Sequence, residues 1–284
     1  MGVGFSPPHR PLFFDQYTAW ISRRKNADMS WLEKNVHIRE DPSLLLPGCR
    51  TIISLAFPYP VHKPATPDSL CVSRYSEPDQ EDYHQRLKRL ARKAAVYILE
   101  VFEGAATRIC VDSAPLLERS LAYASGIGFI GKNNMLIVPG FGSYFYLAEI
   151  LTTAAFDLPV KEPAENLCGS CTLCVDACPT GALEKPYSLN ASRCLSYLTI
   201  EQRSAVNEEQ GRKMGDCFFG CDRCQEACPH NGGEGERRVC LPSSGEYMRM
   251  DRGTFAEMFG KTAFARPGLE KIQTNIRAIT GGER

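Results

Sequence analysis

The sequence has no apolar run long enough to cross a bilayer, which takes about 20 consecutive residues, so a membrane-spanning protein is not expected. It also has no net charge, because 33 Lys and Arg residues balance 33 Asp and Glu residues. A nucleic-acid partner would therefore have to bind a local basic patch. No secretory h-region is recognisable at the start, which favours a cytoplasmic protein whose cysteines stay reduced.

Cysteine, by contrast, is abundant, and most of it falls in two staggered runs. The first run has the C-x2-C-x2-C-x3-C-P spacing of bacterial two-cluster ferredoxins, and the second repeats the last part of that pattern. The runs comprise Cys168, Cys171, Cys174 and Cys178, then Cys221, Cys224 and Cys228. In such a run the first three thiolates bind one [4Fe-4S] cluster and the fourth binds the other. The spacing therefore predicts a two-cluster electron-transfer module.

The staggered runs also predict which cysteines share a cluster. Cys228 completes the cluster of the first three cysteines, and Cys178 joins Cys221 and Cys224 in the second. The second cluster still lacks one thiolate. Its candidates from the residues alone are Cys194, Cys217 and Cys240.

Zinc and disulfides are the alternatives for so many cysteines. Two C-x2-C pairs can form a four-cysteine zinc site, but seven thiolates in two runs that each end in Cys-Pro exceed what such a site needs. Dense C-x2-C spacing is poorly suited to disulfides. Cys49, Cys71 and Cys110 are predicted to be buried thiols without a ligand.

Strands and helices alternate ahead of the cysteines. The apolar patterns predict helices over 14–24, 79–102 and 115–126, and strands over 51–57, 108–112, 134–138 and 144–151, with a Pro-rich loop over 60–67. Such alternation indicates a layered α/β domain. We expect three parts: an α/β domain over 1–160, a ferredoxin-like two-cluster domain over 161–235, and a short helical tail over 236–284.

One glycine pattern, Gly126-Ile-Gly128-Phe-Ile-Gly131, matches the dinucleotide-binding fingerprint G-x-G-x-x-G. That fingerprint must follow a strand and open a helix, so that the pyrophosphate meets the helix N-terminus. Here it follows a predicted helix and leads into a predicted strand. We interpret it as a helix stop and a tight turn.

Several motifs together resemble the epoxyqueuosine reductase family. They are Val111-Asp-Ser-Ala-Pro-Leu-Leu-Glu-Arg119, Gly126 to Asn133, Gly142-Ser-Tyr-Phe-Tyr-Leu-Ala-Glu149, the first cysteine run, Arg193-Cys194-Leu-Ser-Tyr-Leu-Thr199 and Gly220 to Pro229. The resemblance covers most of the chain. It implies a cobalamin-binding α/β domain, two [4Fe-4S] clusters and Cys194 as the missing ligand of the second cluster. Cys217 and Cys240 are then predicted to be buried thiols without a ligand.

The activity that the resemblance implies is reduction of epoxyqueuosine to queuosine at the wobble position of tRNA. Breaking a C–O bond reductively takes electrons delivered one at a time, which clusters provide, and a strongly reducing centre, which cobalamin provides. The leaving oxygen needs a proton, and the resemblance implies Asp112 as its general acid, with a pKa raised by an apolar pocket. From the residues alone, Asp112 is interpreted as a helix cap before Pro115.

Cobalamin contacts are also implied by the resemblance. They are Arg39, Arg74, Asp112, Lys132, Met135, Ser196 and Asp222. His84 resembles a family motif at the start of the long helix, although an exposed helix histidine is the alternative.

The implied partners are a tRNA anticodon stem-loop and an external low-potential electron donor of the flavodoxin or ferredoxin type. Many family members continue into helical repeats that help to hold tRNA, whereas this sequence resembles only the beginning of that region. Its last part is basic and could contact phosphate, through Arg237, Arg238, Arg249, Arg252, Lys261, Arg266, Lys271 and Arg277. The competing functions are a corrinoid reductive dehalogenase acting on a small molecule, or a ferredoxin-type partner that reduces cobalamin.

Overall fold

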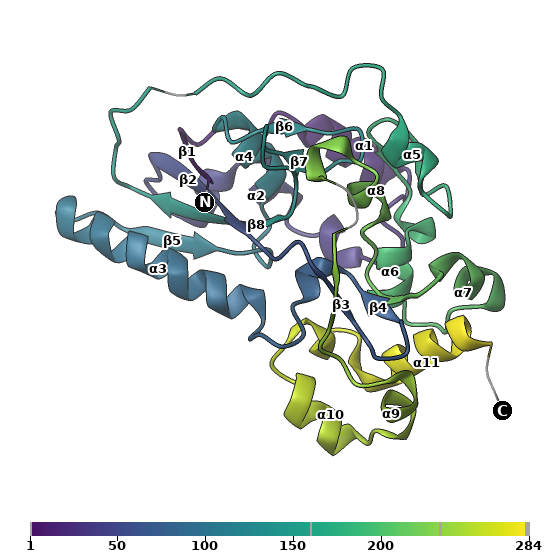
Figure 1. Cartoon of the computed structure of the whole chain (residues 1–284). Coiled ribbons are helices and arrows are strands. Elements are labelled where there is room, and N and C mark those ends of the chain that lie inside the picture. Colours follow the sequence, from purple (N-terminus) through teal and green to yellow (C-terminus); the bar gives the residue numbers. More distant parts are fainter. Residues whose placement is uncertain (1, 160, 233–234, 282–284) are drawn as a thin grey trace. The chain divides into compact units, whose positions relative to one another are not determined.

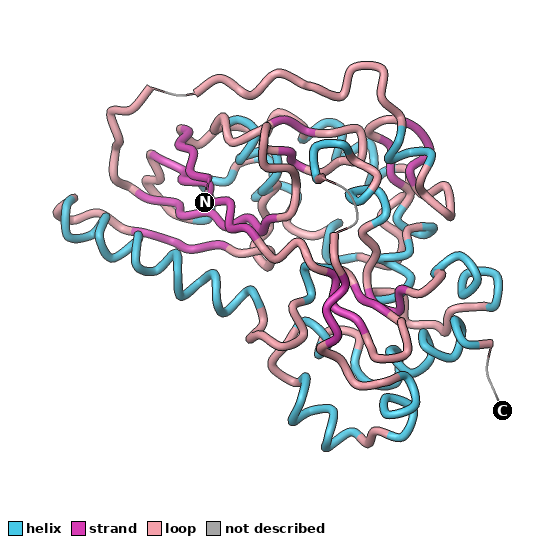
Figure 2. Tube along the Cα trace, viewed as in Figure 1, coloured by secondary structure: helices cyan, strands magenta, loops and turns pink. Residues whose placement is uncertain are grey.

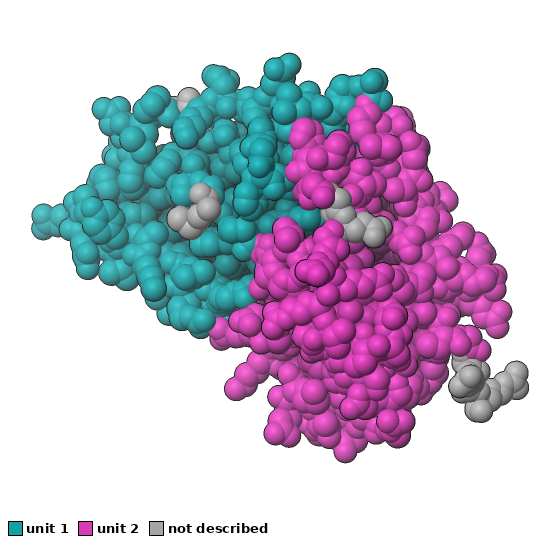
Figure 3. Space-filling view, in the orientation of Figure 1, with its two compact units in different colours: residues 1–58, 84–170 teal, residues 59–83, 171–284 magenta. Residues whose placement is uncertain are grey.

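A computed structural model describes residues 2–159, 161–232 and 235–281 (Figure 1). The chain forms two compact units, coloured separately in Figure 3. Unit 1 comprises residues 1–58 and 84–170, and unit 2 comprises residues 59–83 and 171–284. Residues 1, 160, 233–234 and 282–284, which fall at or near the ends of the predicted domains, lie outside the described residues, and those boundaries stay predictions.

Unit 1 contains a four-stranded antiparallel sheet in the order β1-β2-β8-β5. Its elements are β1 (Gly2–Ser6), α1 (Phe14–Ser22), α2 (Val36–Glu40), β2 (Thr51–Pro58), α3 (Tyr83–Val101, of which Tyr83 belongs to unit 2), β5 (Thr107–Cys110), α4 (Glu118–Ala124), β6 (Phe129–Ile130), β7 (Leu136–Ile137) and β8 (Phe145–Thr152). The mixed α/β class is therefore confirmed, and the predicted strands are found within a few residues of their expected ends.

The long helix α3 begins later than predicted. Its buried residues are Leu87, Ala91, Ala95 and Ile98, a stripe that repeats every three or four positions. Leu90 lies outside this stripe and is 39% exposed.

Helix α4 packs on one face of the sheet. Four residues face one another across the strands in a single row: Gly4, Ser54, Glu149 and Cys110. Residues directly opposite in antiparallel strands share a face. A Cβ on Gly4 would lie 2.3 Å from Ser125 Oγ at the end of α4, so this row faces α4.

The glycine pattern after α4 matches its interpretation as a helix stop. Gly126 follows the helix end at Ser125 with φ +75°, a conformation that glycine adopts without cost. A Cβ on Gly128 would lie 2.2 Å from the carbonyl oxygen of Ile137, so β6 and β7 approach closely here. The pattern thus closes a helix and opens a hairpin.

Unit 2 is built from short elements. They are β3 (Lys63–Ala65), β4 (Cys71–Val72), α5 (Leu173–Asp176), β9 (Leu183–Lys185), β10 (Ser188–Leu189), α6 (Leu195–Ile200), α7 (Glu208–Met214), β11 (Cys217–Phe219), α8 (Arg223–Glu226), β12 (Arg237–Val239), α9 (Ser244–Arg249), α10 (Arg252–Phe259) and α11 (Gly268–Thr280). One sheet has the order β11-β4-β3-β12, with strands of two or three residues (Figure 2).

The Pro-rich segment 60–67, predicted as a loop, contains β3. Proline cannot donate to a strand ladder, which is why the segment was interpreted as irregular. Lys63 and Ala65 supply the bonds on either side of Pro64: Lys63 N–H donates to the Glu236 carbonyl at 2.8 Å, and the Ala65 carbonyl accepts from Cys240 N–H at 3.1 Å.

The C-terminal helices belong to the core of unit 2. Phe218, Tyr247 and Phe264 are fully buried together, and Ile272 of α11 packs into the same cluster. Asn275 of α11 donates from its amide to the carbonyls of Thr199 and Phe218, both at 2.9 Å. In the described part of the chain, no helix combines the length and the apolar character that a bilayer crossing requires.

Candidate iron–sulfur and acid sites

The two cysteine runs fold alike. Each places a four-residue helix, α5 or α8, over the second cysteine of a C-x2-C step, Cys174 or Cys224, and each ends in Cys-Pro, at Cys178 and Cys228. The two helices pack against each other. Such a short helix followed by proline turns the chain sharply, which allows the last cysteine of a run to leave the loop formed by the others. Cys168 belongs to unit 1, where its N–H donates to Asn166 Oδ1 at 3.0 Å.

The surroundings of Cys194 favour it as the missing ligand. Cys194 interacts electrostatically with Cys178, Cys221 and Cys224, the three thiols predicted to share its cluster. Cys217 is also near Cys221, but its thiol meets Cys71 and donates to the carbonyls of Phe219 and Gly220, both at 3.5 Å.

The third candidate, Cys240, lies elsewhere in unit 2. It interacts with Asp79 and Arg238 and with the backbone of Ala65.

These thiols suit a metal cluster chemically. Burial raises the pKa of Cys221 to about 12 and raises the pKa of Cys194 and Cys224, because a thiolate is poorly solvated there. Iron would hold them as thiolates. Among the described residues no three His, Cys, Asp or Glu side chains converge on one metal ion. A cube has a different requirement, since each of its four thiolates binds its own iron.

Asp112 lies on the loop between β5 and α4 in unit 1. Its backbone is left-handed, with φ 52°. Its Oδ2 is 3.2 Å from His84 Nε2, and its N–H donates to Glu118 Oε1 at 2.6 Å. The side chain of Asp112 is 60% exposed. Helix α4 begins at Glu118 with Leu117 as its N-cap, so the interpretation of Asp112 as a helix cap is wrong.

Behind this loop lies a pair of carboxyls that the sequence analysis missed, half-buried Glu118 and fully buried Glu149. Glu149 of β8 is 0% exposed, and no donor among the described residues reaches either of its side-chain oxygens. The Glu118 carboxyl lies within hydrogen-bonding reach. Burial, and then the charge of Asp112, raise the pKa of Glu118 to about 7. Burial, and then the charge of Glu118, raise the pKa of Glu149.

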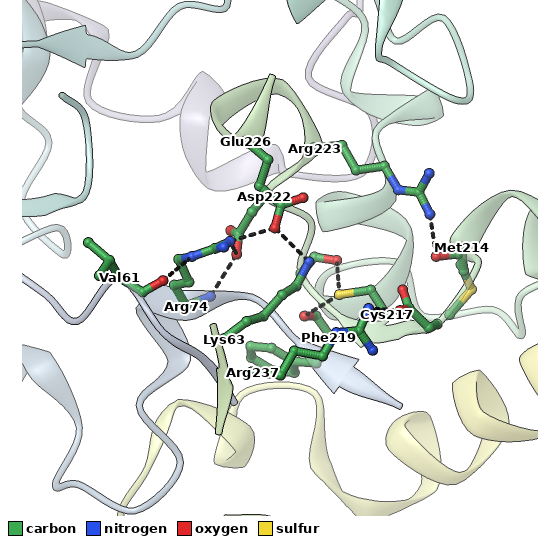
Figure 4. A network of polar contacts seen from close by, with 12 residues as sticks. Val61, Lys63, Arg74, Met214, Cys217, Phe219, Asp222, Arg223, Glu226 and Arg237 are labelled. Carbon is green, nitrogen blue, oxygen red and sulfur yellow. Dashed lines mark hydrogen bonds and ion pairs between the residues drawn. The ribbon is translucent and has the colours of Figure 1, made fainter. Parts of the chain in front are cut away.

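Two predicted cobalamin contacts, Arg74 and Asp222, bind each other in the interior of unit 2. Arg74 Nη1 lies 3.1 Å from Asp222 Oδ2 and 2.5 Å from Glu226 Oε1, and Lys63 Nζ lies 2.8 Å from Glu226 Oε1 (Figure 4). The Arg74 side chain is 0% exposed. Arg74 Nε also donates to the Val61 carbonyl at 2.7 Å. The network therefore joins segment 61–74 to α8.

Breaking this network should destabilise the protein. Glu226→Ala removes the acceptor that Lys63 and Arg74 share, and an uncompensated buried charge typically costs about 3–5 kcal/mol. We expect urea unfolding of the variant to show a loss of this size at matched cluster content. The control is Glu208→Ala, which removes an exposed carboxylate 3.9 Å from Arg212 and should change stability by less than about 0.5 kcal/mol. Equal losses in the two variants would contradict the prediction.

The other predicted cobalamin contacts are spread over the two units. In unit 1, Arg39 is buried and donates to the Leu116 carbonyl at 3.4 Å, and Lys132 Nζ donates to the Gly169 carbonyl at 2.6 Å. Half-buried Met135 has its sulfur 3.9 Å from a guanidinium nitrogen of Arg119. In unit 2, Ser196 lies in the first turn of α6.

Two buried hydrogen-bond donors of unit 1 could bind a ligand. Arg39 Nε and Asn134 Nδ2 have no hydrogen-bond partner among the described residues. A buried donor is normally satisfied, so each fits a ligand that brings acceptors, such as amide carbonyls or phosphate oxygens. Asn134, which was not predicted, also has a left-handed backbone, with φ 63°.

Comparison with known proteins gives two family matches. The profile described as "4Fe-4S double cluster binding domain" matches residues 167–231, and the profile described as "Epoxyqueuosine reductase QueG, DUF1730" matches residues 39–113. A curated epoxyqueuosine reductase of Escherichia coli (strain K12) is 38% identical over 219 residues, which is 75% of this chain but only 57% of that protein. One from Leadbetterella byssophila is 33% identical over 269 residues, covering 92% of this chain and 87% of that protein.

Solved structures agree with the sequence matches. A crystal structure of epoxyqueuosine reductase with an epoxyqueuosine-modified tRNA-Tyr stem loop aligns with a TM-score of 0.82 and 31% identity, covering 98% of this chain and 76% of that one. A Bacillus subtilis epoxyqueuosine reductase, described with its aspartate-bearing catalytic loop swung out of the active site, aligns with a TM-score of 0.80 and 30% identity over the same shares.

Proposed function

Because this chain belongs to the epoxyqueuosine reductase family, we propose that it reduces epoxyqueuosine to queuosine in the wobble position of tRNA. The observation that carries the proposal is the loop that holds Asp112 beside His84 and Glu118, because an exposed acid on a constrained loop can present a proton to a substrate. A solved relative is described as having a catalytic loop that bears an aspartate. We assign Asp112 as the catalytic acid.

The reaction requires electrons, which the cofactors would supply, and protons, which side chains would supply. Turning the epoxide into an alkene and water consumes two electrons and two protons. The family depends on cobalamin and iron–sulfur clusters, and bound cobalamin would supply a strongly reducing metal centre that the clusters recharge one electron at a time. The protein's own groups must then bring protons to the leaving oxygen and exclude unproductive reduction.

We assign Arg39, Lys132, Met135 and Ser196 as cobalamin contacts on the family resemblance. The buried Arg39 Nε, which has no hydrogen-bond partner among the described residues, is the donor that best supports this assignment. We also assign Asp112 as a contact of both the cofactor and the substrate. Arg74 and Asp222 already satisfy each other, so we propose that they act by holding their loops in place. The first cluster takes Cys168, Cys171, Cys174 and Cys228, and the second takes Cys178, Cys194, Cys221 and Cys224.

Binding of tRNA by the basic tail has less support than its composition suggested. Arg237, Arg238, Arg252 and Arg266 form ion pairs with acidic residues of unit 2. Lys271 donates to the Ser204 carbonyl at 2.9 Å, and burial lowers its pKa to about 8. The exposed Arg249, Lys261 and Arg277 are the positions that we propose meet phosphate. The electron donor would be a low-potential flavodoxin or ferredoxin, and the reaction cytoplasmic.

The proposal is tested by loading the anaerobically purified chain with cobalamin, iron and sulfide, and supplying a chemical reductant with tRNA that carries epoxyqueuosine. Nucleoside analysis by mass spectrometry should show conversion to queuosine. The control omits cobalamin from an otherwise identical sample. Reduction of a halogenated small molecule without any conversion of the tRNA nucleoside would favour the dehalogenase alternative instead.

A further inference from the structure

The proposed reaction needs two protons at the leaving oxygen, but a carboxylic acid carries one. Asp112 must therefore be reprotonated within each turnover. Its exposed face meets His84, and its backbone contacts a second carboxyl, that of Glu118. Another group must therefore supply the proton that Asp112 takes up after it has donated its own.

The geometry behind Asp112 shows a place that must hold a proton. Glu149 is fully buried, and its oxygens meet no donor among the described residues, while the nearby Glu118 group is another carboxyl. Two ionised carboxylates cannot hydrogen-bond to each other, and like charges at such distances cannot both persist in an apolar site. One shared proton resolves both problems, since the protonated carboxyl donates to the ionised one.

The pair is also connected to the acid. Glu118 Oε1 accepts from the Asp112 backbone at 2.6 Å, and the charges of Asp112, Glu118 and Glu149 interact. Among the described residues, the groups near the pair include the Cys110 thiol and Arg108 of β5, the buried Ser54 hydroxyl of β2, and Arg119 of α4. Burial, and then the charge of Glu149, raise the pKa of Cys110 to about 12, so this thiol stays protonated and does not neutralise the pair.

We propose that Glu118 and Glu149 form a proton-sharing carboxyl pair beneath α4 that reprotonates Asp112 during each reductive turnover. The inference rests on the proposed function and deepens it. The proton passes from the pair to the Asp112 carboxylate, which has just given its own to the leaving oxygen, and the pair recovers a proton from water. No electron moves in this step. Glu118 and Glu149 are positioning residues in the sense that they act through Asp112.

The first test is spectroscopic and needs no substrate. Infrared spectra of the anaerobically purified protein with both clusters at neutral pH should contain the carbonyl band of a buried protonated carboxyl, shifted in D2O. Glu149→Gln should remove this band, whereas Asp112→Asn should keep it. The matched control is Glu100→Gln, which changes an exposed glutamate of α3. A band that disappears in Asp112→Asn and survives in Glu149→Gln would overturn the proposal, because the stored proton would then lie on Asp112.

The pH dependence of the free energy of unfolding is a second test of the same pair. The pKa of Glu118 rises from 4.5 to about 7 on folding, so above pH 4.5 the folded chain keeps a proton that the unfolded chain has released. Stability should therefore fall as pH rises from 4.5 to about 7. Glu149→Gln should flatten the slope, because it removes the Glu149 carboxyl, whose own pKa is raised by burial and then by the charge of Glu118. An unchanged slope would contradict the shared proton.

The kinetic test uses the loaded enzyme. Glu149→Gln should slow turnover at least about tenfold, less than the loss of the acid itself, and should remove the decline in rate above about pH 7 that the pair imposes on the wild type. Wild-type rates in Glu149→Gln would leave His84 as the proton source and overturn the proposal. If the wild type itself converts no epoxyqueuosine, the proposed function fails, while the infrared and stability results still decide whether the pair exists.

Discussion

Asp112→Asn is expected to retain both clusters and bound cobalamin and to lose turnover of epoxyqueuosine tRNA by about 10²–10⁴-fold, the usual contribution of a positioned general acid. Asparagine preserves the size of the side chain and accepts the left-handed backbone of this position, with φ 52°, nearly as well as aspartate. It cannot give up a proton to an alkoxide. The loss should therefore be kinetic, with thermal stability close to that of the wild type.

Single-turnover measurements with chemically reduced enzyme isolate this effect from the unknown electron donor. Iron, sulfide and corrinoid analyses on the same sample show whether the cofactors are intact. The control is Asp28→Asn, an exposed aspartate of unit 1, which should turn over at the wild-type rate. A rate for Asp112→Asn within about threefold of wild type, far below the contribution of a general acid, would remove Asp112 from the mechanism.

The second large effect concerns the clusters. Cys194→Ser should lose the cluster that Cys178, Cys221 and Cys224 share, so that bound iron falls by about half. Turnover should stop, because the chain of electron carriers to the substrate is interrupted. Anaerobic iron and sulfide analysis, together with electron paramagnetic resonance of the reduced protein, measures both clusters.

Cys217→Ser is the matched control. Cys217 is buried and its thiol donates to the carbonyls of Phe219 and Gly220, bonds that a serine hydroxyl can also make. This variant should keep all of its iron. Loss of iron from Cys217→Ser but not from Cys194→Ser would reverse the assignment, and a preparation that holds zinc in place of iron would remove the clusters altogether.

The parts of this protein that the sequence predicts are those with a local cause. The cysteine spacing depends on a few neighbouring residues, and so does the strand over 51–57, whose β-branched run predicted β2 almost to its ends. The family resemblance pointed to Cys194, which spacing alone left level with Cys217 and Cys240. Only the structure shows which thiols lie near Cys194, because Cys178, Cys221 and Cys224 are distant from it in the sequence.

The pairing of Glu118 with Glu149 could not be predicted from the sequence. Glu118 and Glu149 both stand in motifs that carry the family resemblance, but one begins a helix and the other lies within an apolar strand, 31 positions apart. A signal was present, since a glutamate inside the buried run 144–151 conflicts with its surroundings. Its partner could not be named until α4 was seen to pack over the same face of the sheet.

Because Asp112 has a left-handed backbone, we expect a trade-off between stability and activity at this position in laboratory evolution. Glycine adopts such a conformation without steric cost, whereas aspartate does not. A library selected for heat resistance alone should therefore enrich Asp112→Gly and yield robust protein that no longer catalyses. Selection that alternates heat challenge with a demand for queuosine would keep the aspartate, so the position offers a direct measure of how strongly function constrains the fold.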